Sequence, residues 1–277
     1  MLNIIIGKNS NLSKALSKEL INTILIKTSD IVKDLEKITF AKYKNINIIF
    51  NQFQISTKLN ILENPIDYIQ RSILSTSEVL TYIKINHIKI NKIIYTSSSS
   101  VYGNNIASSE IDKINPLNLH ASLKTANEQL IIKFCIDNKI DYSIARIFNM
   151  YGGDDNFSII SKILNIYNNN NTLSIINNGE SIRDYIYILD VVYSYKNILN
   201  HKNIPIINIG TSSGKSILYI LEYLRKKGIE IKTTNIEKNE LKISISQNDL
   251  LLKILGKYSF TNVEEYLCNT IQKMKEL

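Results

Sequence analysis

Short runs of apolar, mostly β-branched residues alternate along the first half of the chain with longer stretches in which apolar residues recur at helical spacing. The short runs predict buried strands, and the longer stretches predict helices. The predicted strands are 2–6, 23–27, 46–50, 92–96 and 142–147, and the predicted helices are about 11–20, 65–86 and 119–138. Because β-branched strands that alternate with helices are typical of a sheet covered on both faces, the sequence predicts an α/β fold with a doubly wound parallel sheet.

Beyond about residue 150 the alternation becomes less regular. A run of asparagines at 168–171 favours a loop. The candidate strands in this part are 185–188, 204–209 and 243–245. We therefore expect a larger sheet domain over 1–150 and a smaller region over 151–277.

The composition is that of a globular protein, with 44% hydrophobic residues and only 9 Gly and 3 Pro among 277 residues. The formal net charge is +8, but the lysines are spread along the whole chain, so we expect no nucleic-acid partner. The sequence has no run of 18 apolar residues and no signal-peptide pattern, so we expect no membrane association. The two cysteines lie far apart, and His87 and His201 have no ligands at metal spacing, so we expect a cytoplasmic protein without a metal site.

Arginine is rare in this lysine-rich chain and occurs at only four positions. Arg71 and Arg225 fall on predicted helices, where we interpret them as chance residues. Arg146 and Arg183 lie in polar segments instead. Because guanidinium is a planar, two-pronged donor that lysine cannot replace, these two positions are candidates for bidentate hydrogen bonding.

The turn after the first strand carries serine where a dinucleotide-binding turn usually carries glycine. The pattern GxxGxxG is represented here by Gly7, Ser10 and Ser13. Serine is small, caps helices and donates hydrogen bonds to phosphate, so a dinucleotide site and an ordinary strand–turn–helix both fit this segment. Farther along, Asp30 suits a ribose hydroxyl whereas Lys27 suits a 2′-phosphate, which leaves both NAD and NADP open.

Four further polar segments follow in order along the chain. They are Ser-Ser-Ser-Ser-Val-Tyr-Gly at 97–103, His-Ala-Ser-Leu-Lys at 120–124, Arg-Ile-Phe-Asn-Met-Tyr-Gly at 146–152, and Arg-Asp-Tyr-Ile at 183–186 with a preceding glycine and a following Asp-Val. In this order and spacing they resemble the SSxxVYG, YxxxK, RxFNxYG and RDYI motifs of the extended short-chain dehydrogenase/reductase family. That family comprises nucleotide-sugar epimerases, dehydratases and ketoreductases, and the resemblance covers about residues 1–215.

The resemblance implies a Rossmann-type domain over 1–150 that binds NAD or NADP, and a region over 151–277 that binds a nucleoside-diphosphate sugar. It implies that Ser98 contacts the reacting sugar oxygen and that Lys124 holds the nicotinamide ribose. The implied cofactor-binding residues are Gly7, Ser10, Asn11, Leu12, Asp30, Asn51 and Lys124. The implied substrate-binding residues are Ser98, Asn149, Asn156, Phe157 and Arg183, with Arg183 as a bidentate donor to the diphosphate.

The chain departs from this family at His120, which stands where the family has its catalytic tyrosine. Composition does not explain the change, because the chain has 16 tyrosines and only three histidines. Imidazole starts from a pKa near 6.5, and the ammonium of Lys124 lowers that value, so we expect a neutral imidazole. Such a group serves the reduction of a ketone better than the reversible oxidation of an alcohol. We therefore favour a 4-ketoreductase in which Ser98, His120 and Lys124 are catalytic.

Three alternatives stay open at this point. A nucleotide-sugar epimerase is the first, and a homologue that binds the cofactor or the nucleotide sugar without turnover is the second. A dehydratase fits less well, because serines occupy the positions after Ser98 where dehydratases carry an acidic pair. The family also implies a homodimer formed through the helices at about 65–86 and 119–138. The segment 210–216 resembles a Walker A loop but is one residue too short, so we interpret it as a turn beside the substrate.

Overall fold

The computed structural model describes residues 1–52 and 65–276, and the chain divides into two compact units. The first unit consists of Met1–Gly103, Ile111–Ile147 and Val192–Ile207, and the second consists of Asn104–Glu110, Phe148–Val191 and Asn208–Leu277. Each unit is therefore assembled from separate stretches of the chain rather than from one stretch on either side of residue 150.

A parallel sheet forms the centre of the first unit. Within the described residues its six strands lie in the order β10-β6-β4-β3-β1-β2. The strands are β1 (Leu2–Ile6), β2 (Thr23–Ile26), β3 (Ile46–Phe50), β4 (Lys92–Ser98), β6 (Asp141–Ile147) and β10 (Ile206–Ile209). The doubly wound α/β fold predicted from the sequence is confirmed. The strand order reverses direction between β1 and β3, and such a switch point is where sheets of this type bind ligands at their carboxyl edge.

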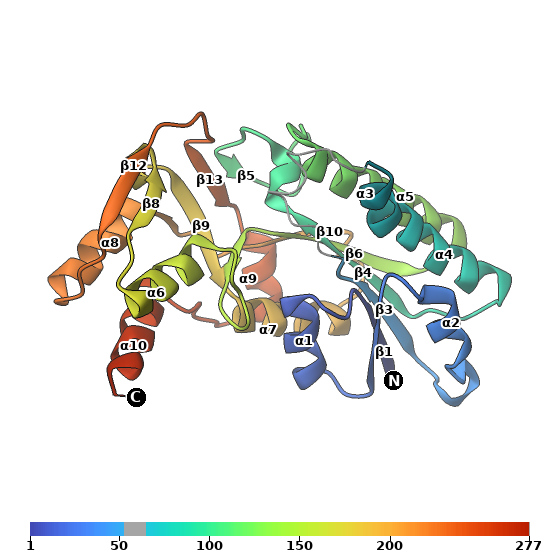
Figure 1. The fold of residues 1–277 in the computed structure, drawn as a ribbon. Helices are drawn as coiled ribbons and strands as arrows, with labels where there is room; N and C mark the ends of the chain where they lie inside the picture. The colour runs from blue at the N-terminus through green and yellow to red at the C-terminus, as the bar shows by residue number, and fades with distance from the viewer. Residues whose placement is uncertain (53–64, 277) are drawn as a thin grey trace. The chain divides into compact units, whose positions relative to one another are not determined.

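Helices cover both faces of this sheet (Figure 1). They are α1 (Asn11–Glu19), α2 (Ile31–Glu36), α3 (Pro65–Ile69), a π-helical turn at Gln70–Leu74, α4 (Ser75–Ile85), α5 (Leu119–Asn138) and α7 (Ile188–Asn200), with short 3-10 turns at Phe40–Lys42 and Ser99–Tyr102. Helices α2, α4 and α5 share one apolar core with the sheet. Helix α7 packs on the other face, where Tyr195 hydrogen-bonds Thr96 at 2.7 Å, and Lys196 links it to Glu19 of α1. The helix predicted over 65–86 is interrupted by the π turn.

The second unit is a smaller α/β assembly. Its strands are β5 (Ala107–Ser108), β7 (Asn149–Tyr151), β8 (Leu173–Ile176), β9 (Ile182–Tyr187), β11 (Gly214–Ser216), β12 (Thr233–Ile236) and β13 (Ile243–Ser246), and its helices are α6 (Ile159–Asn169), α8 (Ile217–Lys226), α9 (Asp249–Leu255) and α10 (Val263–Lys275). Strand β9 pairs with β7, β11 and β13, and β8 pairs with β12. Helices α6, α8 and α10 bury Ile163, Ile220 and Ile271 in one core.

Two boundaries in the second unit differ from the prediction. The loop expected over 168–171 was wrong for its first half, because α6 continues to Asn169 and ends where Asn170 adopts a left-handed conformation with φ of 50°. Asparagine is among the few residues that adopt this conformation readily, so it ends the helix in the role that glycine usually takes. The strand expected over 185–188 begins earlier, at Ile182, and Ile188 already belongs to α7.

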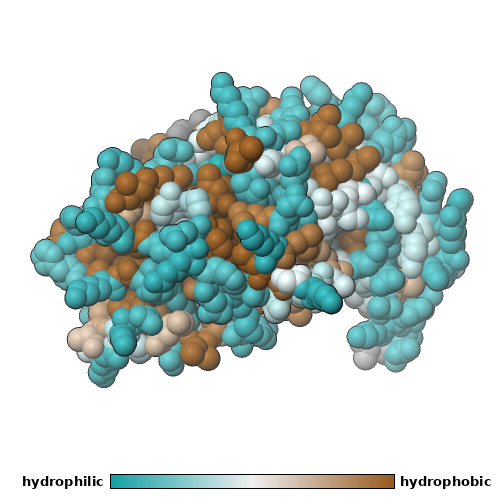
Figure 2. All heavy atoms as spheres, turned by 180° about the vertical axis from the view of Figure 1, so that it is seen from behind, coloured by the Kyte–Doolittle hydropathy of each residue, from teal (hydrophilic) through white to brown (hydrophobic). Residues whose placement is uncertain are grey.

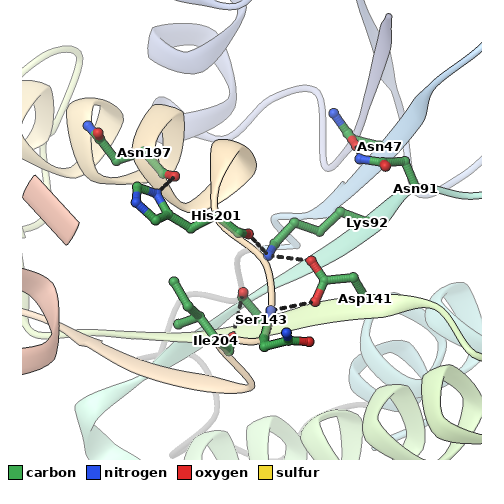
Figure 3. Close-up of polar contacts among 9 residues, drawn as sticks. Asn47, Asn91, Lys92, Asp141, Ser143, Asn197, His201 and Ile204 are labelled. Carbon is green, nitrogen blue, oxygen red and sulfur yellow. Dashed lines mark hydrogen bonds and ion pairs between the residues drawn. The ribbon is translucent and has the colours of Figure 1, made fainter.

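A row of polar side chains crosses the amino-terminal edge of the first sheet. Asn3, Asn47, Lys92 and Asp141 occupy equivalent register positions on β1, β3, β4 and β6. The buried Lys92 ammonium donates to Asp141 Oδ2 at 2.8 Å and to the His201 carbonyl at 2.7 Å (Figure 3). Burial lowers the pKa of Lys92, and its bond to Asp141 opposes that shift. Because a one-residue slip would leave these groups without partners, the row fixes the strand register.

The described helices include none that is long and apolar enough to span a membrane. On the face drawn in Figure 2, hydrophilic side chains are interspersed with smaller hydrophobic patches.

We predict that Lys92→Ala lowers the free energy of unfolding by about 3 kcal/mol, because it removes one partner of a buried ion pair. Denaturant titration measures the change. Lys89→Ala is the matched control, since this exposed lysine lies just before the same strand and its loss changes stability by less than about 0.5 kcal/mol. Equal effects of the two substitutions would contradict a role for Lys92 in the sheet.

Candidate functional site

In the turn between β1 and α1, the backbone at Gly7 passes very close to the backbone at Asn51. Gly7 has a φ of +105°, and a Cβ on it would lie 2.4 Å from the Asn51 carbonyl oxygen, so only glycine fits. Ser10 caps α1 by accepting from the Ser13 N–H at 3.3 Å. The Asn51 amide donates to the hydroxyls of Ser10 and Ser13, both at 2.8 Å. The two serines that replace glycines therefore have a fixed partner at the end of β3.

This turn fits the pyrophosphate of a dinucleotide. Helix α1 begins at Asn11, so its positive dipole end lies at the carboxyl edge of the sheet. The side chain of Leu12 is buried in the core, and Leu12 can therefore serve a ligand only through its N–H. Ser13 is also buried, which shows that a serine is accommodated where α1 packs closely on the sheet.

A cluster of hydroxyls and an imidazole lies at the carboxyl end of β4. Strand β4 ends at Ser98, whose Oγ accepts from the Ser100 N–H at 3.2 Å and from the Ser100 hydroxyl at 3.0 Å. His120 Nδ1 lies 3.5 Å from Ser100 Oγ. Asn118 caps α5 by accepting from the Ala121 N–H at 2.9 Å, which places His120 in the first turn of the helix. The structure thus brings Ser98 and His120 together through Ser100.

Lys124 lies one helical turn after His120 and is buried. Its ammonium donates to the Thr96 carbonyl at 2.7 Å and to the Gln52 carbonyl at 3.3 Å. Burial lowers the pKa of Lys124 to about 8, although the charge of Glu128 opposes this shift. Among the described residues these two carbonyls are its hydrogen-bond acceptors, so one of its three N–H donors remains for a ligand.

The electrostatics agree with the neutral imidazole expected from the sequence. Burial, and to a smaller extent the nearby charge of Lys124, lowers the pKa of His120 to about 4. His120 is therefore uncharged at neutral pH, with one nitrogen carrying a proton and the other able to accept one.

Arg146 forms the two-pronged interaction that its rarity suggested, and its partner is Glu128. Its Nε and Nη2 donate to the two carboxylate oxygens of Glu128 at 3.1 and 2.8 Å, with both side chains buried. The Ser97 hydroxyl also donates to Glu128, and the guanidinium lies over the Tyr102 ring at 4.8 Å. Sequence reasoning had not identified Glu128 as the partner. The network joins β4, β6 and α5 directly behind the hydroxyl cluster.

Of the predicted substrate residues, Ser98 belongs to the first unit and the other four belong to the second. The Asn149 amide donates to the Asp184 carbonyl at 3.3 Å. Arg183 donates through Nη2 to Glu240 at 3.0 Å. Its Nη1 donates to the carbonyls of Ile182 at 2.9 Å and Lys242 at 3.4 Å, so both terminal nitrogens of the guanidinium already have partners. Asn156 and Phe157 are exposed and precede α6.

Asp184 is a structural anchor that sequence reasoning missed. Its buried carboxylate accepts from the Thr211 N–H at 2.8 Å, the Ser212 N–H at 3.0 Å and the Ser246 hydroxyl at 2.5 Å. A Cβ on Gly210 would lie 2.6 Å from Asp184 Oδ2. The turn that resembles a Walker A loop is thus held by a carboxylate, which is unfavourable for a phosphate. Within the described residues no group of three His, Cys, Asp or Glu side chains could hold a metal.

Comparisons with known proteins agree with this architecture. The model of the NAD dependent epimerase/dehydratase family matches residues 7–210. A putative UDP-glucose 4-epimerase of Methanocaldococcus jannaschii is 30% identical over 201 residues, which cover 70% of this chain and 64% of that protein. An uncharacterized protein of the same organism is 27% identical over 281 residues, covering 90% of this chain and 84% of the relative.

Solved structures share the fold. The UDP-glucuronic acid 4-epimerase of Bacillus cereus, solved in complex with UDP-glucuronic acid and NAD, is 20% identical and superposes with a TM-score of 0.83 over 100% of this chain and 99% of that one. The resemblance inferred from the motifs is confirmed, and the nicotinamide cofactor predicted from it is confirmed at the level of the family.

We predict that Arg146→Lys lowers the free energy of unfolding by about 2 kcal/mol, since lysine keeps the charge but cannot donate to both oxygens of the buried Glu128. Thermal or denaturant unfolding measures the loss. The same substitution at the exposed Arg225 on α8 is the control and leaves stability unchanged. A loss of stability at Arg225 as large as that at Arg146 would contradict the role of the Arg146–Glu128 pair.

Proposed function

The chain belongs to the NAD dependent epimerase/dehydratase family, and on that premise we propose that it reduces the 4-keto group of a nucleoside-diphosphate sugar with a nicotinamide cofactor. The observation that carries the proposal is the half-buried, neutral His120 beside Ser98, Ser100 and Lys124. A reduced nicotinamide cofactor, held by the Gly7 turn and Lys124, would supply the hydride for the keto carbon.

The chain's own side chains then supply the proton. The Ser98 hydroxyl donates a hydrogen bond to the keto oxygen and stabilises the alkoxide that develops on it. His120 passes a proton toward that oxygen from one ring nitrogen and receives one from the Lys124 ammonium at the other. With a pKa of about 8, Lys124 is protonated at neutral pH and serves as the proton source.

The same electrostatics favour reduction over alcohol oxidation. Oxidation requires a base that removes the hydroxyl proton, and an imidazole with a pKa of about 4 binds a proton weakly. Epimerisation at C4 includes such an oxidation step, so His120 supports a reductase more than an epimerase. Several relatives carry epimerase names, which makes epimerisation the second candidate.

We assign the nucleotide sugar to residues of the second unit. Asn149 and Arg183 provide amide and guanidinium donors, and Arg183 would bind the diphosphate with the N–H groups that Glu240 and the Ile182 and Lys242 carbonyls do not use. Asn156 and Phe157, exposed before α6, would contact the nucleotide sugar.

We predict that His120→Phe lowers kcat for a nucleotide-linked 4-keto sugar about 100-fold, because the proton relay is lost. The wild-type rate should be constant from about pH 5 to 7, since His120 is already neutral there, and should fall above about pH 8 as Lys124 loses its proton. Cofactor absorbance measures both effects. Ser122→Ala, on the exposed face of the same helical turn, is the control and keeps the wild-type rate.

Two results would contradict this assignment. A half-titration near pH 6.5 would show that its surroundings do not lower the pKa of the His120 imidazole. Cofactor binding without turnover of any 4-keto nucleotide sugar, and without gain on His120→Tyr, would favour a binding protein instead.

We also propose that the protein is a homodimer formed through α4 and α5. Ile85 at the end of α4 is 68% exposed, and Ile136 near the end of α5 is 60% exposed. Apolar side chains this exposed on neighbouring helices favour burial against a second copy.

We predict that the double substitution Ile85→Glu with Ile136→Glu converts the dimer to a monomer, because four charges would be buried at a two-fold interface. Light scattering during dilution measures the mass. Ile111→Glu is the control, since Ile111 is 94% exposed but lies outside these helices, and it leaves the dimer intact. A wild-type protein that is monomeric at high concentration would refute the proposed interface.

A further inference from the structure

An open pocket of about 300 Å³ lies at the carboxyl ends of β1 and β2, beside the Gly7 turn. Its lining residues are all charged: Lys8, Lys27, Asp30, Lys33, Asp34 and Lys37. Four ammonium groups therefore face two carboxylates. The pocket carries an excess of two positive charges, which favours an anionic ligand.

One of the two carboxylates is already neutralised within the pocket. Asp34 Oδ1 accepts from the Lys37 ammonium at 2.8 Å. That hydrogen bond lowers the pKa of Asp34, and the charges of Lys37, Lys8 and Lys33 add to the shift. Asp30 Oδ2 accepts from the neighbouring Ser29 hydroxyl at 2.8 Å. Lys8, Lys27 and Lys33 then remain against the single charge of Asp30.

The backbone places two of these lysines beside the dinucleotide turn. Lys8 directly follows Gly7, and its N–H donates to the Ile26 carbonyl at 3.0 Å. Lys27 is the first residue after β2, which pairs in parallel with β1. Both side chains therefore begin at the same corner of the sheet edge.

The position of Lys27 in the sequence indicates which part of a dinucleotide the pocket would bind. In doubly wound dinucleotide folds, an acidic residue about 20 positions after the first glycine accepts from the adenosine ribose 2′-hydroxyl, whereas a cation nearby accommodates a 2′-phosphate. Here Lys27 follows Gly7 by 27 − 7 = 20 positions. A lysine at this place, with Lys8 and Lys33 beside it, matches a phosphate better than a hydroxyl.

We propose that this lysine pocket binds the 2′-phosphate of the adenosine ribose, so that the chain uses NADP(H) in preference to NAD(H). The inference rests on the proposed function, because it assumes that a nicotinamide dinucleotide occupies the turn. It goes beyond the family description, which names NAD alone. Lys8, Lys27 and Lys33 would form charge-assisted hydrogen bonds to the phosphate oxygens, and Asp30 would contact the ribose 3′-hydroxyl.

Calorimetric titration tests the pocket without any sugar substrate. Two pairs of probes are compared: NADPH with NADH, and 2′,5′-ADP with 5′-AMP. Because hydrogen bonds between lysine ammonium groups and phosphate oxygens are charge-assisted, each 2′-phosphorylated probe should bind at least about tenfold more tightly than its partner. The preference should weaken as salt is raised, since the lysines are exposed to solvent.

Substitutions separate this pocket from the general positive charge of the protein. Lys27→Glu should remove the preference for NADPH and leave NADH binding within about twofold of wild type, because the carboxylate repels the phosphate and accepts from the hydroxyl. Lys89→Glu makes the same charge change just before β4, at the opposite edge of the sheet, and should keep the preference.

The outcomes distinguish the two claims. If NADH and NADPH bind equally and Lys27→Glu changes neither, the phosphate pocket is refuted while the proposed use of a nicotinamide cofactor stands. If Lys89→Glu weakens NADPH as much as Lys27→Glu, the preference comes from net charge and the pocket is also refuted. If neither cofactor binds, the proposed function and this inference fall together.

Discussion

The buried ammonium of Lys124 sets the chemistry of the candidate site. It lies between the carbonyls of Thr96 and Gln52, at the carboxyl ends of β4 and β3, and therefore ties α5 to two strands of the sheet. The same burial that lowers the Lys124 pKa to about 8 accompanies a His120 pKa of about 4. One buried cation thus positions the helix that carries His120, and its charge adds to the burial that keeps the imidazole neutral.

The two edges of the first sheet serve different purposes. At the amino-terminal edge, the row from Asn3 to Asp141 is satisfied internally and fixes the strand register. At the carboxyl edge, polar groups surround the Gly7 turn and the end of β4, where a ligand can use them. Glu128 and Arg146 lie behind the second group, and Glu128 accepts a hydrogen bond from the hydroxyl of Ser97, the residue before Ser98. The rigid register at one edge therefore supports the placement of reactive groups at the other.

Much of this arrangement was accessible from the sequence, because it depends on local periodicity and on short motifs. The helix at 119–138 and the strands of the first sheet follow directly from apolar spacing. The π turn at Gln70–Leu74 could not be predicted, because it contains no proline or glycine that would indicate a break in the helix. Likewise, the sequence does not show at which asparagine of the run 168–171 the helix α6 ends. The structure shows that it ends at Asn169, because Asn170 adopts the left-handed conformation.

The partners of charged groups were the part that sequence could not supply. The scarcity of arginine pointed to Arg146, but its pairing with Glu128 across 18 residues required the packed helix and strand. Asp184 belongs to a segment that the sequence assigns to the substrate. In the structure its carboxylate instead accepts from the Thr211 N–H and holds the turn that begins at Gly210. Lys8 and Lys33 are ordinary residues in a lysine-rich chain until the fold gathers them with Lys27 around one pocket.

We propose that the site protonates, through His120, the alkoxide that would form when a reduced nicotinamide transfers its hydride to a keto sugar. The most direct test uses a reduced nicotinamide cofactor that carries deuterium at the transferred position of C4, mixed with the protein and a nucleotide-linked 4-keto hexose. We predict that the product carries deuterium at sugar C4, with one oxidised cofactor formed for each sugar, as read by NMR and absorbance. A sugar that changes configuration without net consumption of cofactor, or that remains unlabelled, would contradict the account.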